Sequence, residues 1–317
     1  MSKTETTTYT SGKNRAVLIG INYTGTSNQL NGCINDVENF YKYLKERFAH
    51  VNEVRLSSTD THRESSDEGD DICGCSCLPS LSSLCKKEKQ TSRRDLSNIN
   101  MADSTLDVLI LTDNQTGLHY PSKKNILNAF HWLTKGATSD SHLALTYSGH
   151  GSHQRDYSRD EEDGQDESIV PADFQKSGMI IDDEIRRVLI DPLPEGCQLR
   201  VIMDCCHSAT SCDLRYGYRA LDFTCQTNSR QTETKCDVIS WSGCLDSQTS
   251  ADAWIDRKFA GALTANFLKI MRDPDQDKSY RAVYAKVHER LKADGYSQRP
   301  QLSSGKEIDL NATFDLF

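Results

Sequence analysis

Two short motifs hold the residues of this chain that could do chemistry. Residues 147–151 read YSGHG and residues 204–208 read DCCHS, and each motif follows an apolar run, at residues 142–146 and 199–203. If both runs are parallel strands, their carboxyl ends meet at one sheet edge, where open α/β sheets place their ligand and catalytic sites. A cysteine thiol needs a base to become a nucleophilic thiolate near neutral pH, and histidine is the usual base. The two motifs therefore predict a Cys–His nucleophile pair.

Cys206 and His150 are the members of this pair that we favour. The backbone N–H groups of Gly151 and Cys206 would then bind the tetrahedral oxyanion, and one such donor can lower the barrier by about 3–4 kcal/mol. His207 competes for the role of base, but neighbouring residues at a strand end tend to point apart, which favours His150. Taken singly, a His-Gly after a strand is usually a loop histidine and a Cys-Cys-His is often a packed strand end, so neither motif alone decides the function.

The segments around these motifs alternate between two hydrophobic patterns. Short continuous apolar runs predict buried strands, and apolar residues spaced three and four apart predict helices. This alternation predicts an α/β fold with a mainly parallel sheet. The expected strands are residues 15–21, 108–111, 142–147, 199–203 and 237–241, and the expected helices are residues 35–48, 122–135, 185–190, 260–271 and 280–292.

Length and composition narrow the class of protein. The chain has 317 residues, 36% of them hydrophobic, which is enough for one large α/β domain or two small ones. Its net charge of −9 argues against general nucleic-acid binding. The first residues lack the apolar core of a signal peptide, and no stretch approaches the about 20 apolar residues of a membrane helix. We therefore expect a cytoplasmic protein whose twelve cysteines are free thiols rather than disulfides.

Three segments break the pattern of strands and helices. Residues 1–13 are polar and predict a disordered tail, residues 55–107 predict a mobile inserted surface loop, and residues 224–235 predict a polar linker. The insert holds four cysteines in C-x-C-x-C spacing, which suits structural zinc poorly, although a metal-binding adaptor built on this cluster stays an alternative. The four are Cys73, Cys75, Cys77 and Cys85.

Together, the two motifs resemble the paired signatures of metacaspases, in the caspase-like clan of cysteine peptidases. Other segments resemble the same family, and the likeness covers most of residues 14–317 except the insert. It is strongest to the kinetoplastid-type metacaspases. The further matching segments are residues 15–23, 30–37, 171–174, 181–185, 240–244 and 300–303.

The resemblance implies a fold and a reaction. The fold is a caspase-like three-layer α/β sandwich, with a central, mostly parallel sheet and helices on both faces. It is a single peptidase domain, residues 14–317, with a large-subunit-like part (14–223) and a small-subunit-like part (236–317). The reaction is calcium-dependent endopeptidase cleavage with Cys206 as nucleophile and His150 as base. Ala209 stands where the family commonly has glycine, which leaves open a catalytically impaired paralogue with a regulatory or binding role.

The resemblance also implies cleavage after Arg or Lys. A buried guanidinium needs a carboxylate-lined pocket, and the family pattern assigns this charge to Asp36 and Asp204, with Cys33 and Ser148 in the wall. Two simpler readings compete. Asp36 could cap a helix, and Asp204 could be a strand-end carboxylate that accepts hydrogen bonds from nearby amides.

A calcium site is the cofactor that the resemblance implies. Residues 155–167 are rich in Asp and Glu, and such a run is usually a solvated face. Calcium, however, requires several oxygen ligands. The family's site maps onto Asp166, Asp182, Asp183 and Asp213, and a cation held there would order the loop after the nucleophile. The simpler reading of Asp182 and Asp183 is favourable pairing with a helix dipole.

The expected partners follow from this specificity. The substrates are peptides or proteins with Arg or Lys at the cleavage position. We expect no nucleic-acid partner, no transmembrane segment and a monomeric enzyme. An Arg/Lys-specific peptidase also attacks its own exposed loops, so self-cleavage is expected in the insert and the linker. The basic residues concerned are Lys86, Lys87, Lys89, Arg93, Arg94, Arg230 and Lys235.

Overall fold

The computed structural model describes most of the chain outside the tail and the insert. The described residues are 14–56, 104–155, 165–205, 212–220, 222–243, 252–255, 258–296 and 299–317. The predicted tail and the cysteine cluster of the insert lie outside them. So do Ala209 and the five basic residues of the insert, and predictions about all of these stay predictions.

A mixed sheet is the centre of the described structure. Its strands are β1 (Asn14–Gly20), β2 (His50–Glu53), β3 (Thr105–Thr112), β4 (His142–Ser148), β8 (Gln198–Asp204), β9 (Tyr216–Tyr218), β10 (Cys225–Thr227), β11 (Asp237–Ser242) and β14 (Gln301–Ser304). They lie in the order β10-β9-β14-β11-β8-β4-β1-β3-β2. The pairs from β2 to β11 are all parallel, whereas β14 is antiparallel to both neighbours. The prediction of a mainly parallel sheet is confirmed.

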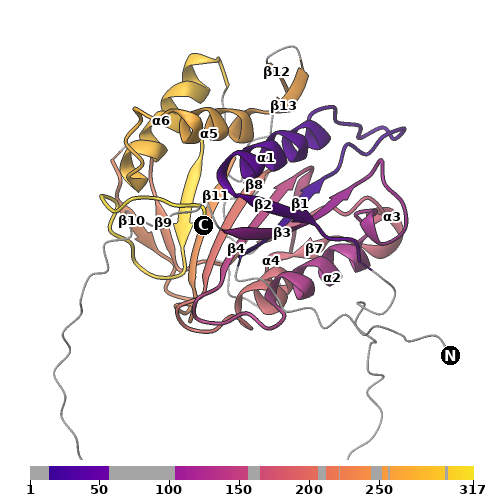
Figure 1. Cartoon of the computed structure of the whole chain (residues 1–317), viewed down its shortest axis with the longest axis horizontal. Helices are drawn as coiled ribbons and strands as arrows, with labels where there is room; N and C mark the ends of the chain where they lie inside the picture. The colour runs from indigo at the N-terminus through magenta and orange to yellow at the C-terminus, as the bar shows by residue number, and fades with distance from the viewer. Residues whose placement is uncertain are drawn as a thin grey trace, which may run out of the picture.

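Helices cover both faces of this sheet (Figure 1). On one face lie α1 (Cys33–Arg47), α5 (Ala262–Arg272) and α6 (Tyr280–Ala293), and on the other lie α2 (Lys123–Thr134), α4 (Asp182–Ile185) and the π-helical η4 (Arg186–Ile190). Two further short helices are η3 (Gly117–His119) and α3 (Phe174–Ser177). The arrangement is the expected three-layer α/β sandwich.

The alternation of side chains along the strands explains the two layers of core. In β1, Ala16 and Leu18 pack in the cluster under α1, α5 and α6, while Val17 and Ile19 pack in the cluster under α2 and η4. All four are fully buried. A strand covered on both faces reads as a continuous apolar run, which is why the inner strands were predictable from sequence.

Two small sheets lie outside the main one. Strands β5 (Gly151–Arg155), β6 (Gln165–Ile169) and β7 (Ile180–Ile181) form one, and β12 (Asp252–Ile255) pairs with β13 (Lys258–Gly261) in the other. Two residues separate the end of β4 from the start of β5, and β13 leads directly into α5. Both small sheets therefore continue from the carboxyl edge of the main sheet or lead back to it.

The segments predicted to be irregular are shorter than expected. β3 begins at Thr105, so the sheet takes in the last three residues assigned to the insert at 55–107. The polar segment 224–235 contains β10, which pairs with β9 at the edge of the sheet. β9, from the large-subunit-like part, pairs with β14 from the small-subunit-like part, so the two parts share one sheet. Among the described helices, none has the length and apolar character needed to cross a bilayer.

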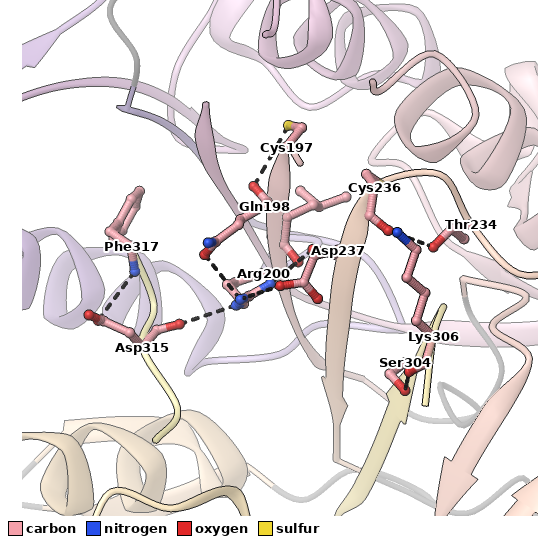
Figure 2. A network of polar contacts seen from close by, with 11 residues as sticks. Cys197, Gln198, Arg200, Thr234, Cys236, Asp237, Ser304, Lys306, Asp315 and Phe317 are labelled. Carbon is pink, nitrogen blue, oxygen red and sulfur yellow. Dashed lines mark hydrogen bonds and ion pairs between the residues drawn. The ribbon is translucent and has the colours of Figure 1, made fainter. Parts of the chain in front are cut away.

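A buried arginine joins the end of the chain to the sheet (Figure 2). Arg200 of β8 is 5% exposed. Its guanidinium donates to Asp237 Oδ2 at 3.0 Å, to the Asp237 carbonyl at 2.9 Å and to the Asp315 carbonyl at 3.2 Å. Gln198 Oε1 accepts a further bond at 3.1 Å. One side chain thus connects two parallel strands and the C-terminal segment.

Candidate active site

The register of β4 and β8 brings the two motifs together. Ser148 pairs with Asp204, and each is the last residue of its strand. His150 follows Ser148 by two residues, just as Cys206 follows Asp204 by two residues. Neighbouring strands lie about 4.8 Å apart. Cys206 and the competing His207 lie outside the described residues, but the chain enters position 206 at the same sheet edge as His150.

A tyrosine holds the backbone and the ring of His150. The Tyr23 hydroxyl accepts a hydrogen bond from the His150 N–H at 3.0 Å and donates to the Val170 carbonyl at 2.6 Å. The Tyr23 and His150 rings are 4.7 Å apart between centroids. Tyr23 has a φ of 51°, a left-handed conformation that is uncommon for a residue with a side chain. Burial raises the pKa of Tyr23 well above its ordinary value, so the phenol stays protonated.

The imidazole of His150 is oriented by a backbone carbonyl. His150 Nε2 lies 2.7 Å from the Asn28 carbonyl oxygen. A carbonyl only accepts, so this contact assigns the ring proton to Nε2 and leaves Nδ1 as the basic nitrogen. This is the arrangement that a general base requires, with one nitrogen oriented by an acceptor and the other available for a thiol proton.

Glycines on either side of His150 suit the turn. A Cβ on Gly149 would lie 2.7 Å from the Tyr147 hydroxyl, closer than carbon tolerates. At Gly151, the hydrogen-bond pattern between β5 and β6 determines the direction of the backbone N–H group. Val170 N donates to the His150 carbonyl, so the next pair, Gly151 with Ile169, is the non-hydrogen-bonded kind. The Gly151 N–H therefore points away from β6, as an oxyanion donor must.

Cys205, the first of the two adjacent cysteines, is a core residue. Cys205 is 1% exposed and packs in the core beneath α2 and η4. It shares this core cluster with Tyr23 and Tyr147. A thiol this buried has no access to a substrate, which supports the assignment of Cys206 as the nucleophile.

The predicted substrate pocket residues converge at the start of α5. Ser148 Oγ donates to Asp36 Oδ2 at 2.5 Å, and Gly261 N donates to both Asp36 oxygens at 2.9 and 3.0 Å. Thr264 N donates to Asp204 Oδ2 at 2.8 Å. A Cβ on Gly261 would lie 2.8 Å from Asp36 Oδ2 and closer still to Asp204 Oδ2. The two carboxylates therefore flank one glycine, at the positive end of a helix dipole.

Each simpler reading of these carboxylates can now be judged by its contacts. Asp204 does accept a hydrogen bond from a nearby amide, as the simpler reading expected. Asp36 does not cap its own helix, because the N-cap position of α1 is Gly32, which makes no side-chain cap. Cys33 begins α1, is buried, and donates its N–H to Asn22 Oδ1 at 3.0 Å. Ser148 is in contact with Asp36, and Cys33 lies three residues before Asp36 in the same helix.

The residues predicted to bind calcium are largely buried acids. Asp166, Asp182 and Asp213 are each at most 3% exposed, and Asp183 is half-buried. Burial and the charges of Asp213 and Glu167 raise the pKa of Asp182 to about 10. Asp182 Oδ2 also accepts the Glu167 N–H at 2.8 Å. In the described part of the chain, no group of three or more His, Cys, Asp or Glu side chains is arranged as a ready metal site.

Three residues that contact or affect the candidate site residues were not predicted from the sequence. Glu167 was noted only as part of an acidic run, yet its charge acts on Asp182. Tyr23 and Asn28 were treated as part of the first strand and its loop, yet both contact His150. Asn28 acts through its backbone, which no sequence pattern reports. Tyr23 lies three residues past the end of β1, and its place in the family-like segment 15–23 was its only signal.

Comparisons with known proteins agree with this geometry. The family model described as metacaspase, peptidase C14 domain, matches residues 14–91 and 72–215 of the chain. The chain belongs to the metacaspase family. This is a family of cysteine peptidases, so the match identifies a peptidase domain and confirms the resemblance seen in the sequence.

Fungal metacaspases are similar over nearly the whole chain. Metacaspase-1 of Yarrowia lipolytica is 33% identical over 351 residues, which cover 96% of this chain and 64% of that protein. Metacaspase-1A of Aspergillus fumigatus is 33% identical over 349 residues, covering 96% of this chain and 71% of that protein. The chain thus spans less than two thirds of the Yarrowia relative. These relatives are fungal, so a particular likeness to kinetoplastid metacaspases stays a prediction.

The fold itself is also found in a solved structure. The crystal structure of a Geobacter sulfurreducens protein aligns with a TM-score of 0.55 and 20% sequence identity, covering 93% of this chain and 95% of the other. At this identity, the likeness shows the fold alone. Together with the family match, it confirms the caspase-like α/β sandwich.

Proposed function

We propose that this metacaspase is a cysteine endopeptidase that cleaves peptide bonds after Arg or Lys. The observation that carries the proposal is the register of β4 and β8, which pairs Ser148 with Asp204 and starts both motif loops side by side. The orientation of His150 supports the same reaction, because its Nε2 contacts a carbonyl and its Nδ1 is left as base.

The reaction follows from the groups at this edge. His150 Nδ1 takes the proton of the Cys206 thiol, and the thiolate attacks the scissile carbonyl carbon to form a C–S bond. The N–H groups of Gly151 and Cys206 bind the oxyanion. As the C–N bond breaks, the imidazolium gives its proton to the leaving amine. Water, activated by the same imidazole, then hydrolyses the thioester and restores the thiol.

Specificity for a basic side chain rests on the two carboxylates beside Gly261. Asp36 and Asp204 are 3% and 4% exposed, so a guanidinium that reached them would be shielded from water. Charge-assisted hydrogen bonds to buried carboxylates are among the strong ones. Ser148 and the amides of α5 hold both acids in place, which pre-organises the slot.

Calcium dependence is proposed from the buried acids around Asp182. Buried carboxylates that raise one another's pKa are relieved by a cation, and oxygen ligands are what calcium binds. The donors would be Asp182, Asp213, Asp183 and Asp166, and we add Glu167 to this proposed set because its charge acts on Asp182. When bound, the ion would supply positive charge that ties the segment after Cys206 to α4. The Arg186 guanidinium already donates to the Asp213 carbonyl, which fixes the backbone at that point.

The proposed location, assembly and self-processing are those of the sequence prediction. We propose a cytoplasmic, monomeric enzyme that cuts its own exposed basic sites. Of these sites, Arg230 and Lys235 fall in the described segment between β10 and β11, and both are exposed. A basic residue on an exposed loop is open to proteolysis, which supports cleavage there.

A short fluorogenic peptide tests the proposal. A tripeptide ending in Arg before the fluorophore should be cleaved by the full chain, and its counterpart ending in Asp should not. Cys206→Ala should abolish cleavage. No cleavage of the Arg peptide by the wild-type chain, with or without calcium, would favour the impaired paralogue instead.

The calcium arm uses the same peptide. The double change Asp182→Asn with Asp183→Asn should remove any stimulation by added calcium, whereas Asp275→Asn, an exposed aspartate of the α5–α6 turn, should leave it in place. Undiminished stimulation of the double variant would refute this site.

A further inference from the structure

A second hollow lies near the carboxyl edge of the sheet, away from the Cys–His pair. It is a pocket of about 430 Å³ between α6 and the edge strands β9, β10 and β14. Its floor is aromatic, with Tyr218 and Tyr284, and Pro300 closes one side. The Tyr284 hydroxyl donates to the Tyr218 and Pro300 carbonyls at 2.6 and 3.0 Å, so the floor is held by hydrogen bonds.

Positive charge surrounds this pocket on a chain that is acidic as a whole. The positive charges are those of Arg219 and Arg299, which line the pocket and are exposed, and the imidazole of His288 also lines it. Within the described residues, neither guanidinium makes a hydrogen bond or a salt bridge. The one acid in the lining, Asp222, accepts bonds from the Thr224 N–H and hydroxyl, at 3.1 and 2.8 Å.

His288 adds a ring nitrogen to the pocket that makes no hydrogen bond to the described residues. Its Nδ1 is buried and has no hydrogen-bond partner among the described residues. Burial and the charges of Lys292 and Arg299 lower the pKa of His288, so a cluster of positive charge exists around it. An anion in the pocket would meet two exposed guanidinium groups and an imidazole nitrogen.

The strand pairing sets the lateral distance between the pocket at β9 and the end of β8, where we place the cleaved bond. Tyr218 pairs with Leu302, which pairs with Trp241, which pairs with Ile202 of β8. Three strand spacings of about 4.8 Å separate β9 from β8, or about 14 Å. An extended peptide advances about 3.3 Å per residue, so about four residues cover this lateral separation, and one or two more cover the part of β8 between Ile202 and its carboxyl end at Asp204.

We propose that this pocket is an exosite for acidic side chains of the protein substrate, four to six residues from the cleaved Arg or Lys. The proposal rests on the proposed peptidase function. Glu and Asp side chains carry the carboxylate that two guanidinium groups recognise, and peptide backbone and methylene groups suit the aromatic floor. The enzyme would thus select substrates at two places. Asp36 and Asp204 would bind the Arg or Lys at the cleaved bond, and Arg219 and Arg299 would bind an acidic side chain four to six residues away.

Quenched fluorescent peptides test the exosite. Each carries one central Arg and three Glu residues placed four to six positions before or after it, and each has a partner with Gln in place of Glu. In one of the two placements, kcat/KM should be about five- to tenfold higher for the Glu peptide than for the Gln peptide. This ratio should fall at high salt, which screens exposed charges.

Charge reversal then locates the effect. Arg299→Glu and Arg219→Glu should each bring the Glu-to-Gln ratio to one or below, and Arg299→Gln serves if a reversed charge impairs folding. Lys124→Glu, at an exposed lysine of α2, makes the same change in net charge elsewhere and should keep the ratio. A ratio of one for the wild-type chain in both placements, or a ratio unaffected by the two arginine variants, would overturn the exosite.

Two controls separate this proposal from the peptidase function. The short Arg tripeptide does not reach the pocket, so its cleavage reports the catalytic centre alone. Fluorescence anisotropy of labelled Glu and Gln peptides on the full chain carrying Cys206→Ala needs no catalysis. Tighter binding of the Glu peptide, lost in the Arg299→Glu background, would support the exosite even if the tripeptide were not cleaved. Equal binding of both peptides would reject it.

Discussion

At the scale of single residues, the orientation of His150, the proposed base, depends on neighbours that do no chemistry themselves. Tyr23 contacts the backbone of His150 and packs on its ring, and the Asn28 carbonyl selects the tautomer. Both come from the segment after β1, two strands away from Cys206 in the sheet order. A base that must meet a thiol within hydrogen-bond distance gains more from such fixed orientation than from added charge.

Removing one hydroxyl tests this positioning role. Tyr23→Phe should lower kcat/KM for the Arg tripeptide about tenfold, because the His150 backbone loses a partner and the ring gains freedom. It should also lower the free energy of unfolding by about 1–2 kcal/mol, since a buried Val170 carbonyl loses a donor.

The matched control is Tyr120→Phe, whose hydroxyl makes no hydrogen bond within the described residues. A positioning role would change kcat and the pH profile of kcat/KM. If Tyr23→Phe lost stability but kept wild-type kcat and pH profile, Tyr23 would be only structural.

Buried thiols give a prediction about pH. Burial raises the pKa of Cys197 to about 12 and that of Cys236 to about 11. At pH 8, about one in ten thousand and one in a thousand of these thiols is ionised, so iodoacetamide should label exposed Cys225 and leave both unlabelled. The folded state binds more protons than the unfolded chain between about pH 8.5 and these values, so stability should fall as pH rises through that window.

Mass spectrometry of the labelled native chain measures the first effect, and urea titrations at pH 7 and pH 10 measure the second. Labelling of Cys197 or Cys236 as fast as Cys225 at pH 8 would contradict the assignment, as would a stability that rises between pH 8.5 and 10.

At the scale of elements, the inner strands and long helices were predictable because burial dictates their composition. β1, β4, β8 and β11 read as apolar runs since both faces are covered, and helix boundaries agree within about three residues. β2, β9 and β10 were not predicted. They are three or four residues long, and their hydrogen bonds come from neighbours distant in sequence rather than from an intrinsic preference.

The candidate site likewise has features that the sequence could predict and features that only the fold shows. His150 was predicted because parallel strand ends converge, and the Asp36–Asp204 pair because the family pattern names it. The roles of all three stay predictions. The contacts at Gly261 could not, since that glycine lies more than fifty residues after Asp204 and its role is steric. Likewise, only the fold shows that Glu167 lies near Asp182.

The N-terminus of α5 is where an element and the specificity slot meet. Gly261→Ala would drive a methyl group against Asp36 and Asp204. We expect a loss of about 1–3 kcal/mol of stability from overpacking, together with a loss of cleavage after Arg.

Gly217→Ala is the control for this substitution, because its Cβ would meet only the Gln226 carbonyl, at 4.0 Å. Unfolding curves and tripeptide kinetics give both readouts. Wild-type cleavage by Gly261→Ala would remove the acidic slot from the account of specificity.

At the scale of the whole molecule, distant segments depend on one another. The C-terminal segment is held to the sheet through Arg200, at the amino end of β8, while the catalytic edge is at the carboxyl end of the same strand. The interleaving of β9 with β14 joins the two parts in a single sheet. Unfolding of one part should therefore unfold the other.

Arg200→Leu tests this coupling. It removes bonds to two strands and to the Asp315 carbonyl, and it should lower the free energy of unfolding by about 2–3 kcal/mol in a single cooperative transition. The exposed pair of Lys286 and Glu289 provides the control, and Lys286→Leu should cost less than about 1 kcal/mol. Two separate urea transitions for the Arg200 variant would show that the parts unfold independently.

The central claim is that the thiol at 206, the imidazole at 150 and the acidic slot act on one substrate. Labelling with a peptidyl acyloxymethyl ketone, which forms a thioether with an activated thiolate, tests all three at once. The Arg ketone should modify Cys206 rapidly, the Asp ketone should react far more slowly, and His150→Ala should slow the Arg reaction by about a hundredfold or more. An adduct on Cys205, equal rates for the two ketones, or a rate indifferent to His150→Ala would contradict the account.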